Sequence, residues 1–396
     1  MMDITKIRSE TPGLEYVNHL QASGSGLMPQ PVLDAITGHL TLESKIGGYE
    51  AAAQEAEYLD GVYDSIATLL NAHRDEIAVH ENASASWCQA FYSLPLSSGD
   101  RILTCEAEYG ANYVAYLQRA KRDGIIIDVI PSGADGAIDL DALRQMIDEH
   151  VKLIAITWIP TNGGLVNPAA GVGAIAHEHN ITYLLDGCQA VGQMPVDVQE
   201  LQCDFFSATG RKFLRGPRGT GFLYARRSTF ETLEPVMLDH FGADWTQIDA
   251  YELRTDARRF ENWENSYALR AGLRVAIDYA LALGLDNIQT RSWQLAQYLR
   301  DALLAIDGCQ LRDIGTDQCA IVSFTIEGLD PQATVLQLRA DGICIGSSTP
   351  AGTRLDAEAR NLPVVFRAAP HYYNTEAEID DLIVALKHLK RLPSNG

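Results

Sequence analysis

From residue 77 onward, short apolar runs alternate with longer segments in which apolar residues recur at helical spacing. Each run is long enough for one strand, and polar residues cluster where the runs end. This alternation predicts an α/β protein whose large domain holds a mainly parallel, helix-covered sheet. The predicted strands are residues 77–80, 101–104, 125–130, 153–157, 181–185, 205–207 and 221–224.

The segments on either side of this region have a different pattern. Before it, Pro29 and Pro31 introduce an amphipathic helix, and Gly47 and Gly48 interrupt two helical runs. After it, residues 231–256 form a less regular, aromatic-rich connection. Two long helical patterns follow at 269–283 and 288–306, and then a strand at 320–326, a helix at 332–339, a strand at 363–367 and a helix at 376–389.

These patterns predict three parts of the chain. An N-terminal segment covers residues 1–20, a large domain covers 21–256, and a smaller α+β C-terminal domain covers 257–396.

The composition narrows the classes of function. Of the 396 residues, 46% are apolar and 21% charged, and the net charge of -21 argues against nucleic-acid binding, which relies on basic patches. No apolar run approaches the roughly 20 residues that span a bilayer, so we expect no membrane partner and a cytoplasmic location. The seven cysteines are scattered without C-x-x-C spacing, so we expect neither a disulfide framework nor a metal site.

Polar residues with chemical potential follow the predicted strands. In parallel sheets of this kind, ligands bind at the carboxyl ends of the strands. A single site is therefore expected to collect residues 82–86, Tyr109, Asn162, Asp186 and Lys212.

Asp186 and Lys212 together suggest a pyridoxal phosphate site. That cofactor needs an amine for a Schiff base, an acid beside its pyridine nitrogen and donors for its phosphate. Ala83 and Ser84 open a helix directly after a strand, an arrangement that receives phosphate. Other interpretations remain open: Asp186 and Ser84 as helix caps, and Lys212 as a surface lysine in a basic loop with three arginines, Arg211, Arg215 and Arg218.

Two further residues suit an amino-acid substrate. Tyr109 could stack on the cofactor ring and act as a general acid for a leaving group. Arg367 ends an apolar strand, and its planar fork suits a substrate carboxylate. The alternatives are a core or rim tyrosine and a structural ion pair.

Several motifs, in this order, resemble the class V aminotransferase family of fold-type I pyridoxal phosphate enzymes over nearly the whole chain. The motifs are DGCQAV at 186–191, TGRK at 209–212, GPRGTG at 216–221 and RAAPHYYN at 367–374. The resemblance implies the fold-type I transferase architecture, with pyridoxal 5'-phosphate as the cofactor.

The resemblance also implies roles for individual residues. Lys212 forms the Schiff base, Asp186 pairs with the pyridine nitrogen, and Gln189 and Asn162 lie near the phenolic oxygen. The residues implied around the phosphate are Ala83, Ser84, Thr209 and Arg211. Family members are usually homodimers with shared active sites, so residues 262–266 are expected to reach the partner's site.

Departures from the family pattern bear on the reaction. Desulfurases of the family have a histidine where Tyr109 and Arg211 stand, and a sulfur-accepting cysteine in a C-terminal loop. Here that loop, residues 346–354, has no cysteine, and Cys344 just before it is expected to be a strand thiol. Other segments resemble the subgroup with the ergothioneine-pathway C–S lyase, cyst(e)ine lyase and isopenicillin N epimerase.

These observations favour a C–S β-lyase that converts a cysteine conjugate or its sulfoxide to pyruvate and ammonia. An amino-acid racemase or epimerase and an aminotransferase use the same activation at Cα and remain alternatives. A protein that binds the cofactor without turnover is a further alternative.

Overall fold

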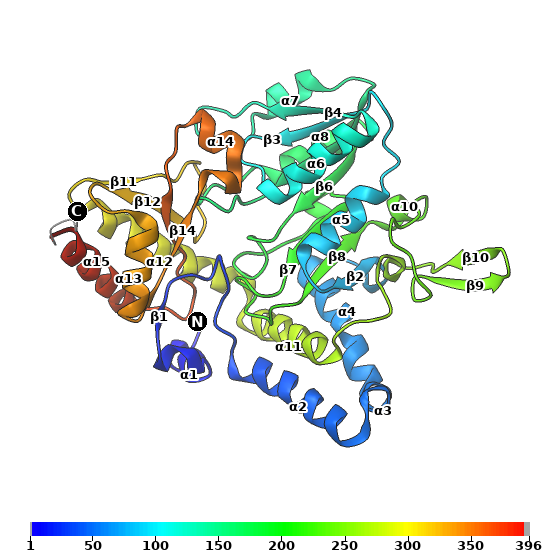
Figure 1. The fold of residues 1–396 in the computed structure, drawn as a ribbon, viewed down its shortest axis with the longest axis horizontal. Helices are drawn as coiled ribbons and strands as arrows, with labels where there is room; N and C mark the ends of the chain where they lie inside the picture. Colours follow the sequence, from blue (N-terminus) through cyan, green and yellow to red (C-terminus); the bar gives the residue numbers. More distant parts are fainter. Residues whose placement is uncertain (1, 392–396) are drawn as a thin grey trace.

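A seven-stranded sheet forms the centre of the larger part of the molecule (Figure 1). The structure is a computed structural model that describes residues 2–391. The spatial order is β2-β8-β7-β6-β5-β3-β4, and only β8 runs antiparallel to its neighbours, so the predicted mainly parallel sheet is confirmed. The strands are β2 (Ile77–His80), β3 (Arg101–Cys105), β4 (Ile126–Ile130), β5 (Val151–Thr157), β6 (Thr182–Asp186), β7 (Phe205–Thr209) and β8 (Gly221–Ala225).

Helices cover both faces of this sheet, and the strands supply apolar side chains to each. Leu184 belongs to the core under α5 (Ala83–Ser93) and α6 (Gly110–Asp123), whereas its neighbour Leu185 belongs to the opposite core. That second core holds side chains from α4 (Ala56–Leu70), α8 (Ala169–Glu178) and α11 (Tyr267–Leu283). Because successive strand residues point to opposite faces, consecutive apolar residues bury the strand on both sides.

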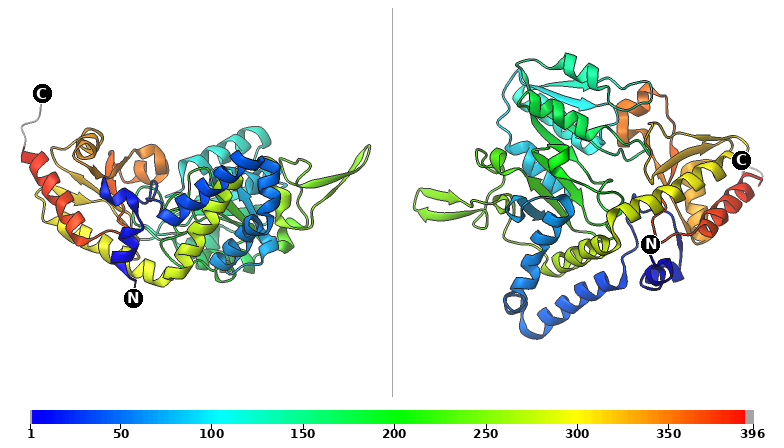
Figure 2. Two further views of the ribbon diagram at one scale, coloured as in Figure 1. Left: turned by 90° about the horizontal axis from the view of Figure 1, so that it is seen from below. Right: turned by 180° about the vertical axis from the view of Figure 1, so that it is seen from behind.

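The smaller unit contains a four-stranded antiparallel sheet in the order β11-β12-β15-β14. The helices at residues 285–304 and 331–340 contact its strands, and the C-terminal helix packs against the first of these two (Figure 2). The predicted strands and helices of this unit are present. They are β11 (Cys309–Leu311), β12 (Val322–Ile326), β14 (Gly346–Ser348), β15 (Val365–Ala368), α12 (Leu285–Leu304), α13 (Pro331–Ala340), α14 (Arg354–Ala359) and α15 (Glu376–Arg391).

The N-terminal segment lies on the smaller unit. Strand β1 (Asn18–His19) pairs in parallel with β13 (Ile343–Cys344), which makes Cys344 a strand thiol, as expected from its sequence position. Helix α11 instead packs along α2 (Gln30–Ile46) and α4 of the larger unit. The predicted boundary at 256/257 stays a prediction, and this packing favours a later one, at Gly284 between α11 and α12.

The connection at 231–256 contains a β-hairpin that the sequence did not predict. Strands β9 (Ala243–Gln247) and β10 (Ala250–Leu253) pair antiparallel and project from the larger unit (Figure 1). Trp245 and Ile248 are exposed on the hairpin, so its two strands lack the one-sided burial that makes a strand recognisable from sequence.

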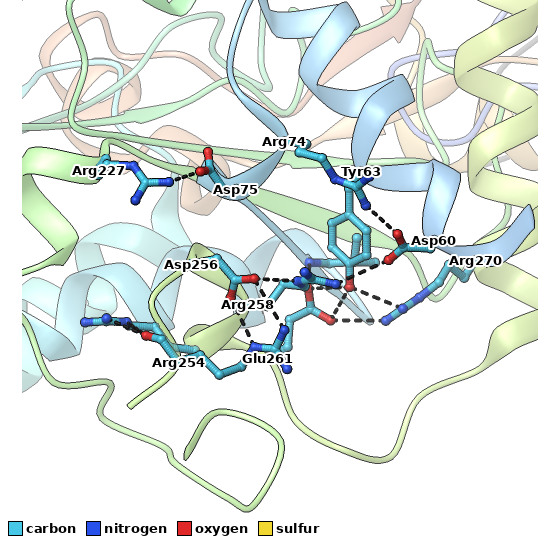
Figure 3. A network of polar contacts seen from close by, with 12 residues as sticks. Asp60, Tyr63, Arg74, Asp75, Arg227, Arg254, Asp256, Arg258, Glu261 and Arg270 are labelled. Atoms are coloured by element: carbon cyan, nitrogen blue, oxygen red, sulfur yellow. Dashed lines mark hydrogen bonds and ion pairs between the residues drawn. The ribbon is translucent and has the colours of Figure 1, made fainter. Parts of the chain in front are cut away.

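A buried carboxylate anchors the chain where it enters α11 (Figure 3). Glu261 is 1% exposed and accepts hydrogen bonds from the Tyr63 hydroxyl at 2.8 and 2.9 Å and from the Val79 amide at 3.0 Å. Arg270 forms an ion pair with it at 3.1 Å. These contacts join α4, β2 and α11, and they fix the start of residues 262–266.

A buried guanidinium joins three distant parts of the chain. Arg215 is 1% exposed and adopts a left-handed φ of 61°. It donates to Leu27 O at 2.7 Å, to the Tyr372 hydroxyl at 2.8 Å and to Thr11 Oγ1 at 2.6 Å. Its guanidinium also lies over three tyrosine rings, those of Tyr279, Tyr372 and Tyr373.

We expect Arg215→Met to lower the free energy of unfolding by about 3 kcal/mol or more, because the buried acceptors Leu27 O and Thr11 Oγ1 would lose their charged donor. Denaturant unfolding of the cofactor-free protein measures the change. Arg218→Met is the matched control, since Arg218 is exposed, and it should stay within about 0.5 kcal/mol of wild type. Equal effects of the two substitutions would contradict the structural role assigned to Arg215.

Within residues 2–391, every helix falls short of the length and apolarity that a bilayer crossing requires. In the same residues, His, Cys, Asp and Glu side chains do not gather in threes that could hold a metal ion.

Candidate active site

An open pocket of about 530 Å³ lies beside the carboxyl ends of β5, β6 and β7. Asn82 and Thr161, which follow predicted strands, line it, as do three residues that were not singled out from the sequence: Thr157, Ile159 and Cys188. The lining includes eight of the predicted site residues: Ala83, Ser84, Tyr109, Asp186, Gln189, Thr209, Arg211 and Lys212.

The first turn of α5 forms one wall of the pocket. Asn82 caps this helix, its Oδ1 accepting from the Ala85 amide at 2.9 Å, so neither Ser84 nor Ser86 is the cap. Strand β8 passes close by: a Cβ on Gly221 would lie 2.6 Å from the Ala83 nitrogen. The glycine therefore lets the helix start sit directly on the sheet, with first-turn amides available to an anion.

Asp186 ends β6 and is 6% exposed. Its Oδ2 accepts from Asn112 Nδ2 at 3.0 Å, and its Oδ1 accepts from the Cys188 amide at 2.9 Å. The alternative of a helix cap is wrong, because residues 188–190 form a turn and the second bond joins Asp186 to its first residue. Within the described chain this carboxylate takes part in no ion pair, and it faces the pocket that Lys212 also lines.

Lys212 faces the same pocket from a turn after β7. The Arg215 amide donates to Lys212 O at 3.0 Å and closes the turn. Burial lowers the pKa of the Lys212 amine and outweighs the opposing effect of Cys188 and Asp186. The alternative of an ordinary surface lysine is therefore wrong.

The three arginines around Lys212 do not form one anion site. Of the three, only Arg211 lines the pocket. The Arg215 guanidinium lies over the three tyrosine rings described above, and Arg218 is exposed. Arg211 donates to Gly24 O, in the loop before α2. Burial lowers the pKa of the Arg211 guanidinium. One guanidinium from this cluster is thus available to an anion in the pocket.

Tyr109 caps α6 and is 39% exposed at the pocket, so it is a rim residue whose ring reaches the cavity. Burial raises the pKa of its hydroxyl, as does the charge of Asp186. The hydroxyl is therefore protonated at neutral pH and able to donate.

Asn162 and Arg367 lie next to the pocket rather than in its lining. Asn162 Nδ2 donates to Thr349 O at 3.2 Å and to Thr353 Oγ1 at 2.9 Å. Arg367 Nη1 donates to Thr161 Oγ1 at 2.7 Å, and Thr161 does line the pocket. Burial lowers the pKa of Arg367 to about 10, and the charge of Arg211 contributes.

Three polar residues near Asp186 were not singled out from the sequence: two lie behind the pocket and the third, Thr157, lines it. Asn112 holds Asp186, and Glu108 and Thr157 form a buried hydrogen-bonded group with it. The signal available in the sequence was polar residues at 108 and 112, four positions apart at the start of a helix.

The residues from 19 to 382 match the model of the family described as Aminotransferase class-V. The chain belongs to this family. A curated relative, a probable cysteine desulfurase of Xylella fastidiosa, is 33% identical over 86% of this chain and 82% of its own length.

Solved structures share the fold. The apo structure of a cysteine desulfurase from Thermococcus onnurineus NA1 superposes with a TM-score of 0.92 at 23% identity, covering 99% of both chains. A cystine C–S lyase, solved in complex with cysteine persulfide, gives 0.86 at 23% identity and covers 95% of this chain and 99% of its own. The fold-type I architecture predicted from sequence is confirmed.

Family membership makes the protein a pyridoxal 5'-phosphate enzyme, as predicted. The pocket fits that cofactor: Asp186 offers an unpaired carboxylate, Lys212 an amine of lowered pKa, and the α5 start offers amides. Gln189 Oε1 is buried without a hydrogen-bond donor among the described residues. A ligand that donates at this point would satisfy it.

We expect borohydride reduction of the cofactor-loaded protein to attach pyridoxal phosphate to Lys212, because it is the amine in the pocket with a lowered pKa. Peptide mass spectrometry locates the adduct. Lys212→Ala should abolish both the adduct and turnover. Lys152→Ala is the control, since Lys152 is exposed, and it should be labelled like wild type. An adduct on another lysine in the wild type would refute the assignment.

Proposed function

We propose that the protein is a C–S β-lyase acting on a cysteine-derived amino acid, either an S-conjugate or its sulfoxide. It would cleave the bond between Cβ and sulfur and yield a sulfur-containing product, pyruvate and ammonia. One observation carries the proposal: the loop at the mouth of the site holds no thiol to accept sulfur.

That loop packs against the start of α6, beside Tyr109. A Cβ on Gly110 would lie 2.5 Å from Ala351 O, and Asn162 ties down Thr349 and Thr353. Residues 346–354 contain no cysteine. Transfer of sulfur to the enzyme therefore lacks an acceptor at this position.

Two other thiols are poor acceptors. Cys344 lies in β13, one strand before the loop, and burial raises its pKa. Cys188 lines the pocket, but burial and the charge of Asp186 hold its pKa well above the usual range. Since the thiolate is the nucleophile, neither thiol is activated.

The chain's own residues supply the remaining steps of such an elimination. When bound, pyridoxal phosphate acts as an electron sink for the carbanion at the substrate Cα. Lys212 would take the Cα proton, since it lines the pocket and burial lowers the pKa of its amine. Tyr109 would donate a proton to the departing sulfur, and Arg367 would hold the substrate carboxylate.

A cysteine desulfurase is the second candidate, because the relative from Xylella fastidiosa carries that name. That reaction would leave alanine and an enzyme persulfide. A racemase or epimerase would need a second acid on the opposite face of the substrate, and an aminotransferase would depend on a keto acid.

We also infer a homodimer whose subunits complete each other's sites. Residues 262–266 support this: Glu261 anchors their start, while Trp263 and Glu264 remain exposed. Trp263 also lines an open surface groove together with Tyr49 and Tyr267.

Product analysis tests the proposed reaction. With cystine, S-alkylcysteines and S-alkylcysteine sulfoxides offered to the loaded enzyme, we expect pyruvate and ammonia in equal amounts, without any keto acid. Alanine with protein-bound persulfide would support the desulfurase instead. Inverted substrate alone would support the racemase, and keto-acid dependence the aminotransferase.

We expect Tyr109→Phe to lower kcat by roughly 10²-fold or more for substrates whose sulfur leaves as a basic thiolate, because these need a proton donor. Substrates with acidic thiol leaving groups should lose much less. Comparing kcat across leaving groups of graded acidity measures the difference. An equal loss for all of them would show that the hydroxyl is not the acid.

A further inference from the structure

A second buried carboxylate lies directly behind Asp186. Glu108 is 2% exposed and sits between β3 and α6, next in sequence to Tyr109. Burial raises its pKa to about 7, while its hydrogen bonds act in the opposite direction. Within the described chain, neither Glu108 nor Asp186 takes part in an ion pair.

Every hydrogen-bond partner of the Glu108 carboxylate is a donor. Oε1 accepts from the Tyr109 amide at 2.7 Å, and Oε2 accepts from Thr104 Oγ1 at 2.9 Å. The other donors are Thr157 Oγ1, Asn112 Nδ2 and the Tyr116 hydroxyl. An environment made of donors alone suits the ionised, acceptor-only form of the side chain.

Asn112 connects the two carboxylates through one nitrogen. Its Nδ2 donates to Glu108 Oε1 at 3.0 Å and to Asp186 Oδ2 at 3.0 Å. An amide nitrogen carries two hydrogens, so both are used and the Asn112 side chain has no freedom to turn. The orientation of Asp186 is therefore set by Glu108 acting through Asn112.

This arrangement is costly without a cation. Two carboxylates so close together repel each other, and within the described residues neither forms an ion pair, although the charge of Lys212 acts on Asp186 across the pocket. A positive group in the pocket beside Asp186 would relieve that repulsion. A protonated pyridine nitrogen is such a group.

We propose that Glu108 is a positioning residue that aims the Asp186 carboxylate at the cofactor's ring nitrogen through Asn112, and strengthens its preference for a protonated ring. The proposal rests on the assignment of Asp186 to that nitrogen, but not on which reaction follows. Through the Tyr109 amide, the same carboxylate also holds the start of α6 beneath the pocket.

Cofactor binding by the cofactor-free protein tests the proposal. The probes are pyridoxal phosphate and 1-deazapyridoxal phosphate, which has carbon in place of the ring nitrogen. The measured quantity is the discrimination ratio, the Kd of the deaza compound divided by the Kd of pyridoxal phosphate. A group that only supports the pocket's shape would weaken both compounds equally and leave this ratio unchanged.

We expect Glu108→Gln to lower the discrimination ratio by about tenfold, the size of one hydrogen bond to a charged group. Asn112→Ala should lower it similarly, and it provides a second variant if Glu108→Gln does not fold. Tyr116→Phe removes the longest bond to Glu108, made to Oε2 and not to the Oε1 that Asn112 contacts, together with a long bond to Ala155 O, so it should leave the ratio near wild type.

An unchanged ratio in both Glu108→Gln and Asn112→Ala would overturn the proposal, as would an equal fall in Tyr116→Phe. Asp186→Ala separates this failure from failure of the cofactor assignment. If Asp186→Ala keeps the wild-type ratio, then Asp186 does not meet the ring nitrogen, and the underlying assignment is wrong.

Discussion

The Arg215 guanidinium is the contact on which the arrangement of the two units depends. A buried cation with no carboxylate partner is tolerated only where several acceptors and aromatic faces surround it. Those groups come from the N-terminal segment, helix α11 and the chain after β15. Because Arg215 belongs to the turn that carries Lys212, its contacts with these three parts of the chain fix the position of that turn.

The chemistry of the pocket follows from withdrawing charges from water. Burial lowers the pKa of the Lys212 amine and raises that of Glu108, whose hydrogen-bond donors act in the opposite direction. Two amide donors, Asn112 Nδ2 and the Cys188 amide, hold the Asp186 carboxylate in place. The site thus combines an amine of lowered pKa with a carboxylate held in place, a pairing that suits the proposed activation at Cα.

Much of the fold and part of the site could be predicted from local pattern. The strands were predictable because they are buried on both faces, and Asp186 and Lys212 because they follow such strands. Glu108 and Asn112 could not be predicted, since their role depends on how α6 packs beside the end of β6, where Asn112 meets Asp186. The destination of Arg215 was equally hidden: a basic loop in sequence became one buried, one exposed and one pocket-facing side chain.

Where tertiary packing decides, sequence patterns alone fail. The β9–β10 hairpin has no buried face to reveal it, and α11 resembles any amphipathic helix until α2 and α4 are seen to receive it. Asn162 illustrates the same limit, because its amide is taken by a loop almost two hundred residues away.

The pairing of β1 with β13 has a consequence for biosynthesis. The ribosome releases the first strand long before its partner, and the Lys212 turn emerges before Tyr372, which must close around Arg215. The nascent large unit can therefore form its sheet early, yet its lysine turn stays incompletely held until almost the whole chain has been made. The full set of contacts around Arg215 therefore needs residues from both ends of the chain.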